Sequence, residues 1–203
     1  MIQNGELVRH ILISLRRIVT GFFWAFLSIC LLSSLNLLFP RIRDCYAGLL
    51  EVFRHVPPLS LIPLLILWFG IGELPKTIII VLASFFPMYL NMDDGFRRCD
   101  RKLLEVGRML GFSPWQSLWK IRLPSALPGI LTGLRVGMGY SLRAIIGAEM
   151  IAADSGLGYL ILDAQAMSRS DKVFIGILTI GTLGLVLDGI FALVERKVLY
   201  WMR

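Results

Sequence analysis

The chain has 203 residues, of which 56% are hydrophobic, and its mean hydropathy is +0.72. This composition excludes a water-soluble domain and indicates a protein with several membrane-spanning segments. The formal net charge is +7, but the basic residues lie in loops beside apolar segments and have no aromatic residues arrayed with them. The charge therefore follows from the positive-inside rule and does not indicate nucleic-acid binding.

Five apolar segments follow one another along the chain and predict an all-α, polytopic membrane fold with about five transmembrane helices. Their ranges are 18–39, 56–72, 77–92, 123 or 128 to about 149, and 173–194. The first has 22 residues and no charge, which is enough to cross a bilayer at about 1.5 Å per residue. Prolines 57, 58 and 63 predict a bent or broken entry to the second segment, where we favour a kinked span over a ligand site. We treat residues 1–203 as one transmembrane domain with a core of about 8–200.

The distribution of Lys and Arg residues predicts which loops face the cytoplasm. Five spans place the two termini on opposite sides of the membrane. With the polar segment 93–124 inside, thirteen of the 21 Lys and Arg residues lie on the cytoplasmic side, six lie outside, and two lie in the fourth span. This bias predicts a cytoplasmic loop at 93–124 and a cytoplasmic C-terminus. The weakest part of this assignment is the N-terminal end, where Arg9, Arg16 and Arg17 face outward.

The segment 103–128 has the pattern of two short helices joined by a turn. Glu105 is expected to open the first helix and Gly111 to end it. Ser113 can cap the second helix, with Gln116 three residues later as in a capping box. The pattern therefore predicts a compact helical loop between two spans.

Small residues on the first of these helices suggest a docking surface. Val106, Gly107 and Gly111 leave little side chain above the helix, so another protein can approach it closely. Glycine costs a helix up to about 1 kcal/mol against alanine, so Gly107 needs a reason. The alternative is an amphipathic loop that only connects two spans.

Two short runs in this loop resemble a known motif. Glu105–Gly111 reads EVGRMLG and Ile121–Pro124 reads IRLP. Together they resemble the EAA loop, E-A-A-x-x-x-G followed by I-x-L-P, of the permease subunits of bacterial ABC importers. Val106 and Gly107 stand where that family prefers alanine. A second resemblance, to permeases of the sulfonate, taurine and nitrate importer group, lies in 54–72, with RHVP, LIPL and LWFGIG.

The resemblance implies a fold like that of type I ABC importer permeases, in which this loop forms a coupling helix that contacts an ATP-hydrolysing subunit. The residues it assigns to that contact are Glu105, Val106, Gly107, Arg108, Gly111, Leu123 and Pro124. It also implies a second permease copy in a homodimer, two ATP-binding subunits and an extracytoplasmic substrate-binding protein, in a bacterial inner membrane. The implied cargo is a small anion such as a sulfonate, taurine or nitrate, with thiamine or pyrimidine precursors also open. Related permeases usually have one more helix before this point, so the chain looks short by one span.

No catalytic residue, metal site or cofactor is predicted in this chain. It has no G-x-x-x-x-G-K-[ST] motif, so ATP is expected to bind a partner subunit. The H-E-x-x-H and G-x-S-x-G motifs are absent as well. The alternatives to a permease are a non-transporting assembly or regulatory membrane protein and, with less support, a membrane enzyme.

Charged residues in the apolar segments are candidates for the solute path or its gate, because ionisable groups at bilayer depth usually face a cavity or a partner. Arg143 would suit an anion path; alternatively it pairs with Glu149 or with another helix at a gate. Arg135 is expected to extend to the cytoplasmic end of its helix. Asp188 is expected to pair with a neighbouring helix.

Glycines at a spacing of four form a ridge on the fourth segment. Gly129, Gly133 and Gly137 share one helical face. Such ridges allow two helices to approach closely. We predict that this face packs against another helix of the chain or against a second copy.

Overall fold

The computed structural model describes residues 5–38 and 40–200, with the side chains at 34, 35, 37, 38, 40–45 and 47 excepted. All regular elements in these ranges are helical, which confirms the predicted all-α fold. In chain order they are α1 (Glu6–Leu38), α2 (Pro40–Phe53), η1 (Pro58–Leu61), α3 (Ile62–Phe69), α4 (Glu73–Arg97), α5 (Arg101–Met109), α6 (Pro114–Ser117), η2 (Leu118–Arg122), α7 (Leu123–Ala152), α8 (Leu157–Ala166) and α9 (Ser170–Val198). The element η1 is a 3-10 helix and η2 is a π-helix.

Three helices of the described chain, α1, α4 and α9, are long and apolar enough to cross a membrane, and α7 with α8, bent by 44°, makes a fourth candidate. They match the predicted first, third, fifth and fourth spans. The predicted second span is not formed as one membrane-crossing helix. Residues 56–72 form only η1 and α3, which together are too short to cross a bilayer. Three prolines interrupt this stretch, and Gly70, with a φ of +74°, ends α3.

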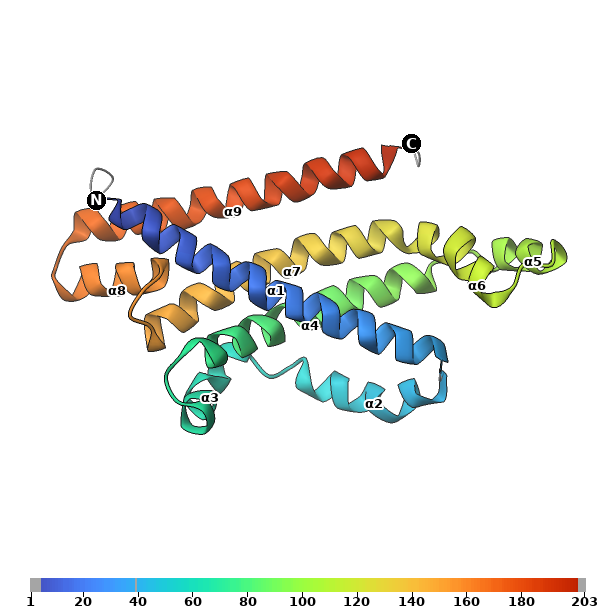
Figure 1. Ribbon diagram of the computed structural model, residues 1–203, viewed down its shortest axis with the longest axis horizontal. Coiled ribbons are helices and arrows are strands. Elements are labelled where there is room, and N and C mark those ends of the chain that lie inside the picture. Colours follow the sequence, from blue (N-terminus) through green and yellow to red (C-terminus); the bar gives the residue numbers. More distant parts are fainter. Residues whose placement is uncertain (1–4, 39, 201–203) are drawn as a thin grey trace.

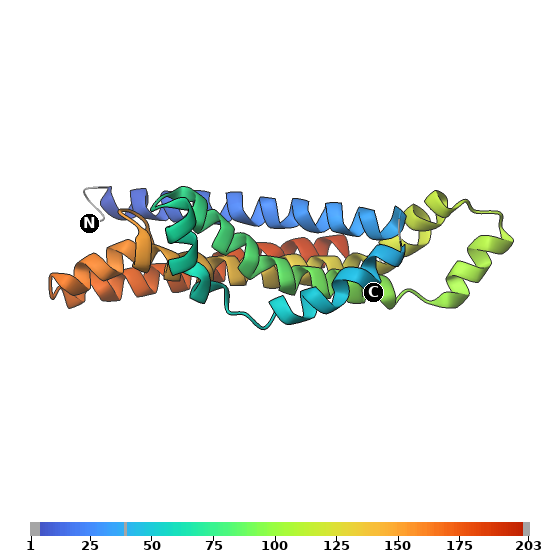
Figure 2. The ribbon, with the colours of Figure 1, turned by 90° about the horizontal axis from the view of Figure 1, so that it is seen from below.

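The helices are laid out along one long axis (Figure 1). α1 and α4 run along it in one direction, α7 runs back, and α9 returns, so α1 begins and α9 ends toward opposite ends. α2 and α3 lead back from the end of α1 to the start of α4 as a broken passage. Both views show α5 and α6 projecting beyond the other helices at one end, with α8 at the opposite end (Figures 1 and 2). The stretches that connect the predicted spans are partly helical, since 40–54 contains α2 and 152–172 contains α8.

The glycine ridge of α7 lies against α4. A Cβ atom added at Gly129 would lie 2.7 Å from the Cα of Gly95, and one added at Gly133 would lie 3.0 Å from the carbonyl oxygen of Met88. A Cβ at Gly137 would lie 2.2 Å from the Met88 side chain. The two helices thus approach at a distance that a larger residue would prevent. Of the two partners considered for this ridge, the structure places a helix of the same chain against it.

The apolar core lies along the seam where α1, α4 and α7 meet. Ile18, Ile79, Ile80 and Ile145 are fully buried there. In a bilayer such a seam is held by close van der Waals packing, because lipid tails are as apolar as the side chains. By contrast, α9 leaves large apolar side chains such as Leu185 exposed, as a helix with a lipid-facing side does.

Candidate functional site

Residues close together in the sequence set the helix ends of the loop that projects between α4 and α7. Its first helix, α5, begins at Arg101, four residues before the predicted start at Glu105. The reason is a cap, because the Asp100 side chain accepts a hydrogen bond from the Lys102 N–H at 2.9 Å. Gly111 follows the end of α5 in the left-handed conformation, with a φ of +72°. The predicted stop at this glycine is therefore correct.

The predicted capping box at the second helix of the loop is confirmed. The Gln116 N–H donates to Ser113 Oγ at 3.2 Å, and the Ser113 N–H donates to Gln116 Oε1 at 2.9 Å. The chain then continues through η2 into α7 without a break. Leu123 and Pro124 are the first two residues of α7, and Pro124, which has no N–H to donate, comes directly after the π-helical turn η2.

Gly107 has a packing role inside the loop. It is buried, and a Cβ atom at this position would lie 2.6 Å from Ile121 Cδ1 and 3.4 Å from Phe112 Cδ2. The absence of a side chain therefore lets α5 lie against η2. The neighbour of Gly107 in the structure thus lies within the same loop, and its predicted contact with another protein stays a prediction.

The tip of the loop exposes a cluster of large apolar side chains, which we call the apolar tip. The exposed fraction is 51% for Val106, 87% for Met109, 67% for Leu110 and 67% for Trp115. Glu105 and Arg108, on the same helix, are exposed as well. Apolar surface of this kind, at the end of a projecting element, is typical of a protein interaction site.

A cavity of about 470 Å³ lies between the α2–α3 stretch and helices α4 and α7, and we call it the Arg143 cavity. The described residues that line it include Arg54, His55 and Arg143 but no carboxylate, and the remaining wall is mostly apolar. The Arg143 guanidinium lies over the Tyr140 ring, 5.4 Å from its centroid. Arg54 is paired with Glu51, one turn earlier on α2. The lining of the cavity therefore combines basic side chains with a mostly apolar wall.

Two more cavities continue along α4 toward the projecting loop. One of about 130 Å³ shares Arg54 and Phe86 with the Arg143 cavity. The next, of about 430 Å³, shares Asp93 and Arg97 with it and reaches the base of the loop. Cavities with shared walls thus follow α4 from Arg143 to the loop.

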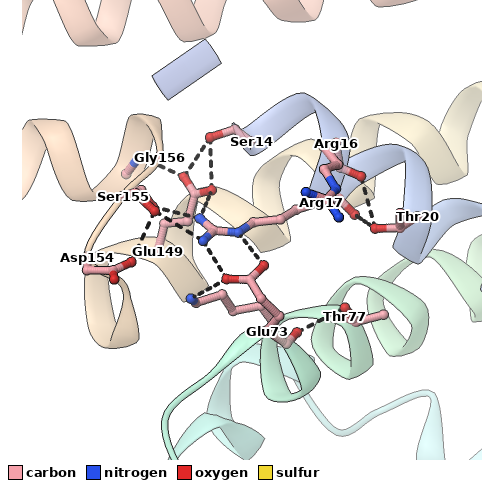
Figure 3. Close-up of polar contacts among 12 residues, drawn as sticks. Ser14, Arg16, Arg17, Thr20, Glu73, Thr77, Glu149, Asp154, Ser155 and Gly156 are labelled. Carbon is pink, nitrogen blue, oxygen red and sulfur yellow. Dashed lines mark hydrogen bonds and ion pairs between the residues drawn. The ribbon is translucent and has the colours of Figure 1, made fainter. Parts of the chain in front are cut away.

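A buried polar cluster holds the opposite end of the molecule together (Figure 3). The Glu149 carboxylate on α7 is fully buried and accepts hydrogen bonds from Ser14 Oγ at 2.8 Å, Arg17 Nη1 at 2.9 Å and the Gly158 N–H at 3.0 Å. A Cβ atom at Gly156 would lie 2.2 Å from the Glu149 carboxyl carbon. The break between α7 and α8 therefore needs small residues to fold over this carboxylate.

Arg17 extends the cluster from α1 to α4. Its Nε and Nη2 donate to the two carboxylate oxygens of Glu73 at 2.7 and 2.6 Å, and Nη1 donates to the Ser155 carbonyl at 2.6 Å. Lys76 Nζ donates to Glu73 Oε1 at 3.0 Å. In the loop after α7, the Ser155 hydroxyl donates to Asp154 and lowers the pKa of that carboxyl. The cluster thus joins α1, α4 and α7 through two cations, Arg17 and Lys76, and two carboxylates, Glu73 and Glu149.

The two candidates for the solute path, Arg143 and Glu149, are six residues apart in the sequence, but they do not contact each other in the structure. The Arg143–Glu149 pair considered above does not form, because six residues are not a whole number of helical turns and the two side chains leave α7 on different sides. Glu149 pairs with Arg17, which the sequence reasoning missed. The only sequence signal for a special role of Arg17 was its outward position, which runs against the positive-inside rule. Its contact with Glu149 joins residues that are 132 positions apart in the chain.

A second ion pair joins α7 to α9. Arg135 donates to both carboxylate oxygens of Asp188 at 2.6 Å, and Glu195 lies 3.5 Å away. The predicted inter-helix role of Asp188 is confirmed. Arg135 is bonded to this partner rather than extended along its own helix. Within the described ranges, no group of His, Cys, Asp and Glu side chains has the arrangement of a metal site.

Comparison with known sequences identifies close relatives. Residues 17–200 match the family model described as "Binding-protein-dependent transport system inner membrane component". The chain is 39% identical to a protein of Bacillus subtilis (strain 168) named as the aliphatic sulfonates transport permease SsuC, over 99% of this chain and 73% of that protein. It is 35% identical to the taurine transport system permease protein TauC of Escherichia coli (strain K12), over 98% of this chain and 72% of that protein.

Solved structures share the fold at lower identity. A chain of the MetNI methionine ABC transporter, in an inward-facing conformation, superposes with a TM-score of 0.81 at 17% identity, with 97% of both chains covered. A chain of an amino acid ABC transporter gives a TM-score of 0.79 at 16% identity, covering 96% of this chain and 95% of that one. Both relatives are named as transport permeases. The chain therefore belongs to the family of binding-protein-dependent transport system inner membrane components, and it is a multi-pass permease subunit of an ABC importer.

Proposed function

We propose that this permease subunit carries a small anion, of the sulfonate, taurine or nitrate type, through the Arg143 cavity. The observation that supports the proposal most directly is a cationic cavity without a carboxylate in its described lining. No ion pair is made by Arg143 with any described residue, so its guanidinium is open to an incoming oxyanion. Guanidinium groups bind oxyanions with two parallel hydrogen bonds. The names of the SsuC and TauC relatives agree with this chemistry.

The cavities that follow α4 support a route from this site to the projecting loop. Arg54 lies between the Arg143 cavity and the next one, and Arg97 lies between that one and the cavity at the loop. An anion moving along α4 would therefore pass from one guanidinium to the next. Several weak sites in series favour release better than one strong site.

Coupling to ATP hydrolysis is assigned to the projecting loop. The apolar tip suits the surface of an ATP-hydrolysing partner, and the assigned residues, listed above from Glu105 to Pro124, lie on α5, in the turn that follows it and at the start of α7. ATP would bind only to that partner, and this chain would need no cofactor. A second copy of the permease, two ATP-binding subunits and an extracytoplasmic binding protein complete the assembly that we propose. The loop would then face the cytoplasm, and so would the end of α9, which runs toward the same end.

Uptake measurements test the anion path. We would reconstitute the permease with its ATPase and binding protein in proteoliposomes and measure ATP-driven uptake of labelled taurine, methanesulfonate and nitrate. Because a charge-assisted hydrogen bond contributes roughly 1.5–3 kcal/mol, Arg143→Gln should reduce uptake at low substrate concentration by about tenfold or more. The control is Arg16→Gln, which removes an exposed charge that does not line the cavity. Unchanged kinetics for Arg143→Gln with every transported anion would remove Arg143 from the path.

Co-purification tests the coupling role. Gly111→Asp should abolish recovery of the ATPase with the permease, because it places a strained, charged residue beside the apolar tip. The control is Gly72→Asp, at a position where an added Cβ would contact nothing within 4 Å. Full ATPase recovery with Gly111→Asp would argue against docking at this loop. Assembly without uptake of any anion in the unmodified system would favour the non-transporting alternative.

A further inference from the structure

The cavity at the base of the projecting loop, which we call the root cavity, has walls from four separate elements. Its volume is about 430 Å³. The end of α1 contributes Asn36, the end of α4 contributes Asp93 and Arg97, α5 contributes Arg101, and η2 contributes Arg122. It is therefore the place where the loop is attached to the helical bundle.

The charges around the root cavity are unbalanced. Three guanidinium groups line it with one carboxylate, and Asp93 is already bonded to Arg97 Nε at 2.9 Å. The side chains of Arg101 and Arg122 make no hydrogen bond or ion pair with any described residue, and both are exposed, so a solute can reach them. Like charges around one cavity repel one another, and they disfavour the arrangement unless an anion lies between them.

We propose that the root cavity binds a tetrahedral oxyanion group, of the sulfate or phosphate type, between Arg97, Arg101 and Arg122. The volume lies in the range of small-molecule sites, and guanidinium forks match the oxygen geometry of such groups. Because the three arginines belong to α4, α5 and η2, one bound anion joins both arms of the loop to the bundle. The site lies at the loop end of the proposed solute path, but its binding test requires neither transport nor an ATPase, so the two proposals can fail separately.

Two sources supply this chemistry, namely a free oxyanion and the phosphate head group of an anionic phospholipid. One arm of the test measures binding of radiolabelled sulfate to the full chain in nanodiscs made only of phosphatidylcholine. The other arm uses native mass spectrometry of the chain in detergent to compare retained phosphatidylglycerol with retained phosphatidylcholine. Sulfate binding identifies the free anion as a ligand, and selective retention of phosphatidylglycerol identifies the lipid.

The variant Arg101→Gln/Arg122→Gln should weaken whichever binding is observed by about tenfold or more, since it removes two charge-assisted donors. The charge-matched control is Lys102→Gln/Lys120→Gln, which removes two exposed charges from the same loop without touching the cavity lining. Equal binding by the arginine variant and the unmodified chain overturns the proposal. So does the absence of both sulfate binding and phosphatidylglycerol selectivity in the unmodified chain.

A measurement on the unmodified chain guards against a folding defect in the variants. If free sulfate is the ligand, hydrogen exchange of amides in 97–122 should slow with sodium sulfate relative to sodium chloride of equal ionic strength. If lipid is the ligand, exchange should slow in nanodiscs that contain phosphatidylglycerol. The amides of α8, at the other end, should not respond. No change at 97–122 under either condition counts against the site.

Discussion

Removing Arg17 should destabilise the permease strongly, because it would leave a buried carboxylate without a cation. Arg17 is 6% exposed and Glu149 is fully buried, so water replaces little of the lost interaction. In Arg17→Leu, Glu149 keeps only Ser14 Oγ and the Gly158 N–H as donors. Breaking a buried ion pair by removing one partner costs about 3–5 kcal/mol. For a domain of this size the expected fall in Tm is roughly 6–20 °C.

A double-mutant cycle separates the ion pair from lost packing. Glu149→Gln alone places an amide N–H₂ among three donors and should cost about 2–3 kcal/mol. With Gln at 149, the loss of Arg17 no longer leaves a buried charge there, and Glu73 retains Lys76. The double variant should therefore be more stable than the sum of the singles predicts, by about 2 kcal/mol.

The assay is thermal and chemical unfolding of the purified chain in one detergent, followed by tryptophan fluorescence. Arg16→Leu is the control, because the neighbouring arginine is exposed and its side chain bonds to no described residue. It should leave Tm nearly unchanged. Equal shifts for Arg16→Leu and Arg17→Leu would refute the reasoning, as would additivity of the cycle to within about 0.5 kcal/mol.

Substitutions at four glycines give further tests, followed by the same unfolding assay except where proteolysis is named. Gly129→Ala should lower stability by about 1–3 kcal/mol, because its Cβ meets the backbone of α4, whereas Gly139→Ala, with open space around it, should be neutral or stabilising. Gly156→Ala should lower Tm about as much as Glu149→Gln, since its Cβ overlaps that carboxylate and its φ is +117°. Gly107→Ala should be tolerated, because only the end of a flexible side chain must move, but Gly107→Leu should loosen the loop, seen as faster proteolysis there. A larger loss of stability for Gly139→Ala than for Gly129→Ala, no loss for Gly156→Ala, or faster proteolysis for Gly107→Ala than for Gly107→Leu would contradict the contact described for that glycine.

Local sequence patterns were sufficient for much of the fold. Hydropathy identified the helices that became α1, α4, α7 and α9, since span length depends only on consecutive residues. The Ser113–Gln116 box and the stop at Gly111 were predictable for the same reason, because a cap involves residues three or four apart. The second span was misjudged, since composition alone did not show how far the prolines and Gly70 would shorten its helix.

The candidate site was only partly predictable. The sequence indicated Arg143 as a cation at a cavity, but it did not show that Arg54 and His55, almost ninety residues earlier, share that cavity. Gly107 was recognised as unusual for a helix, but its neighbour Ile121 was not foreseen. Such contacts depend on how separate helices pack, and a single sequence does not record that.

The sequence by itself determined that the chain is a helical membrane permease with a charged loop between two spans, because hydropathy, caps and a motif are properties of neighbouring residues. Only the tertiary structure decided which charge meets which. Glu149 bonds to Arg17 across 132 residues, and Arg17 bonds to Glu73 across 56. A buried charge must find a partner wherever the fold supplies one. That partner is set by the packing of α1, α4 and α7, and spacing along the chain does not reveal it.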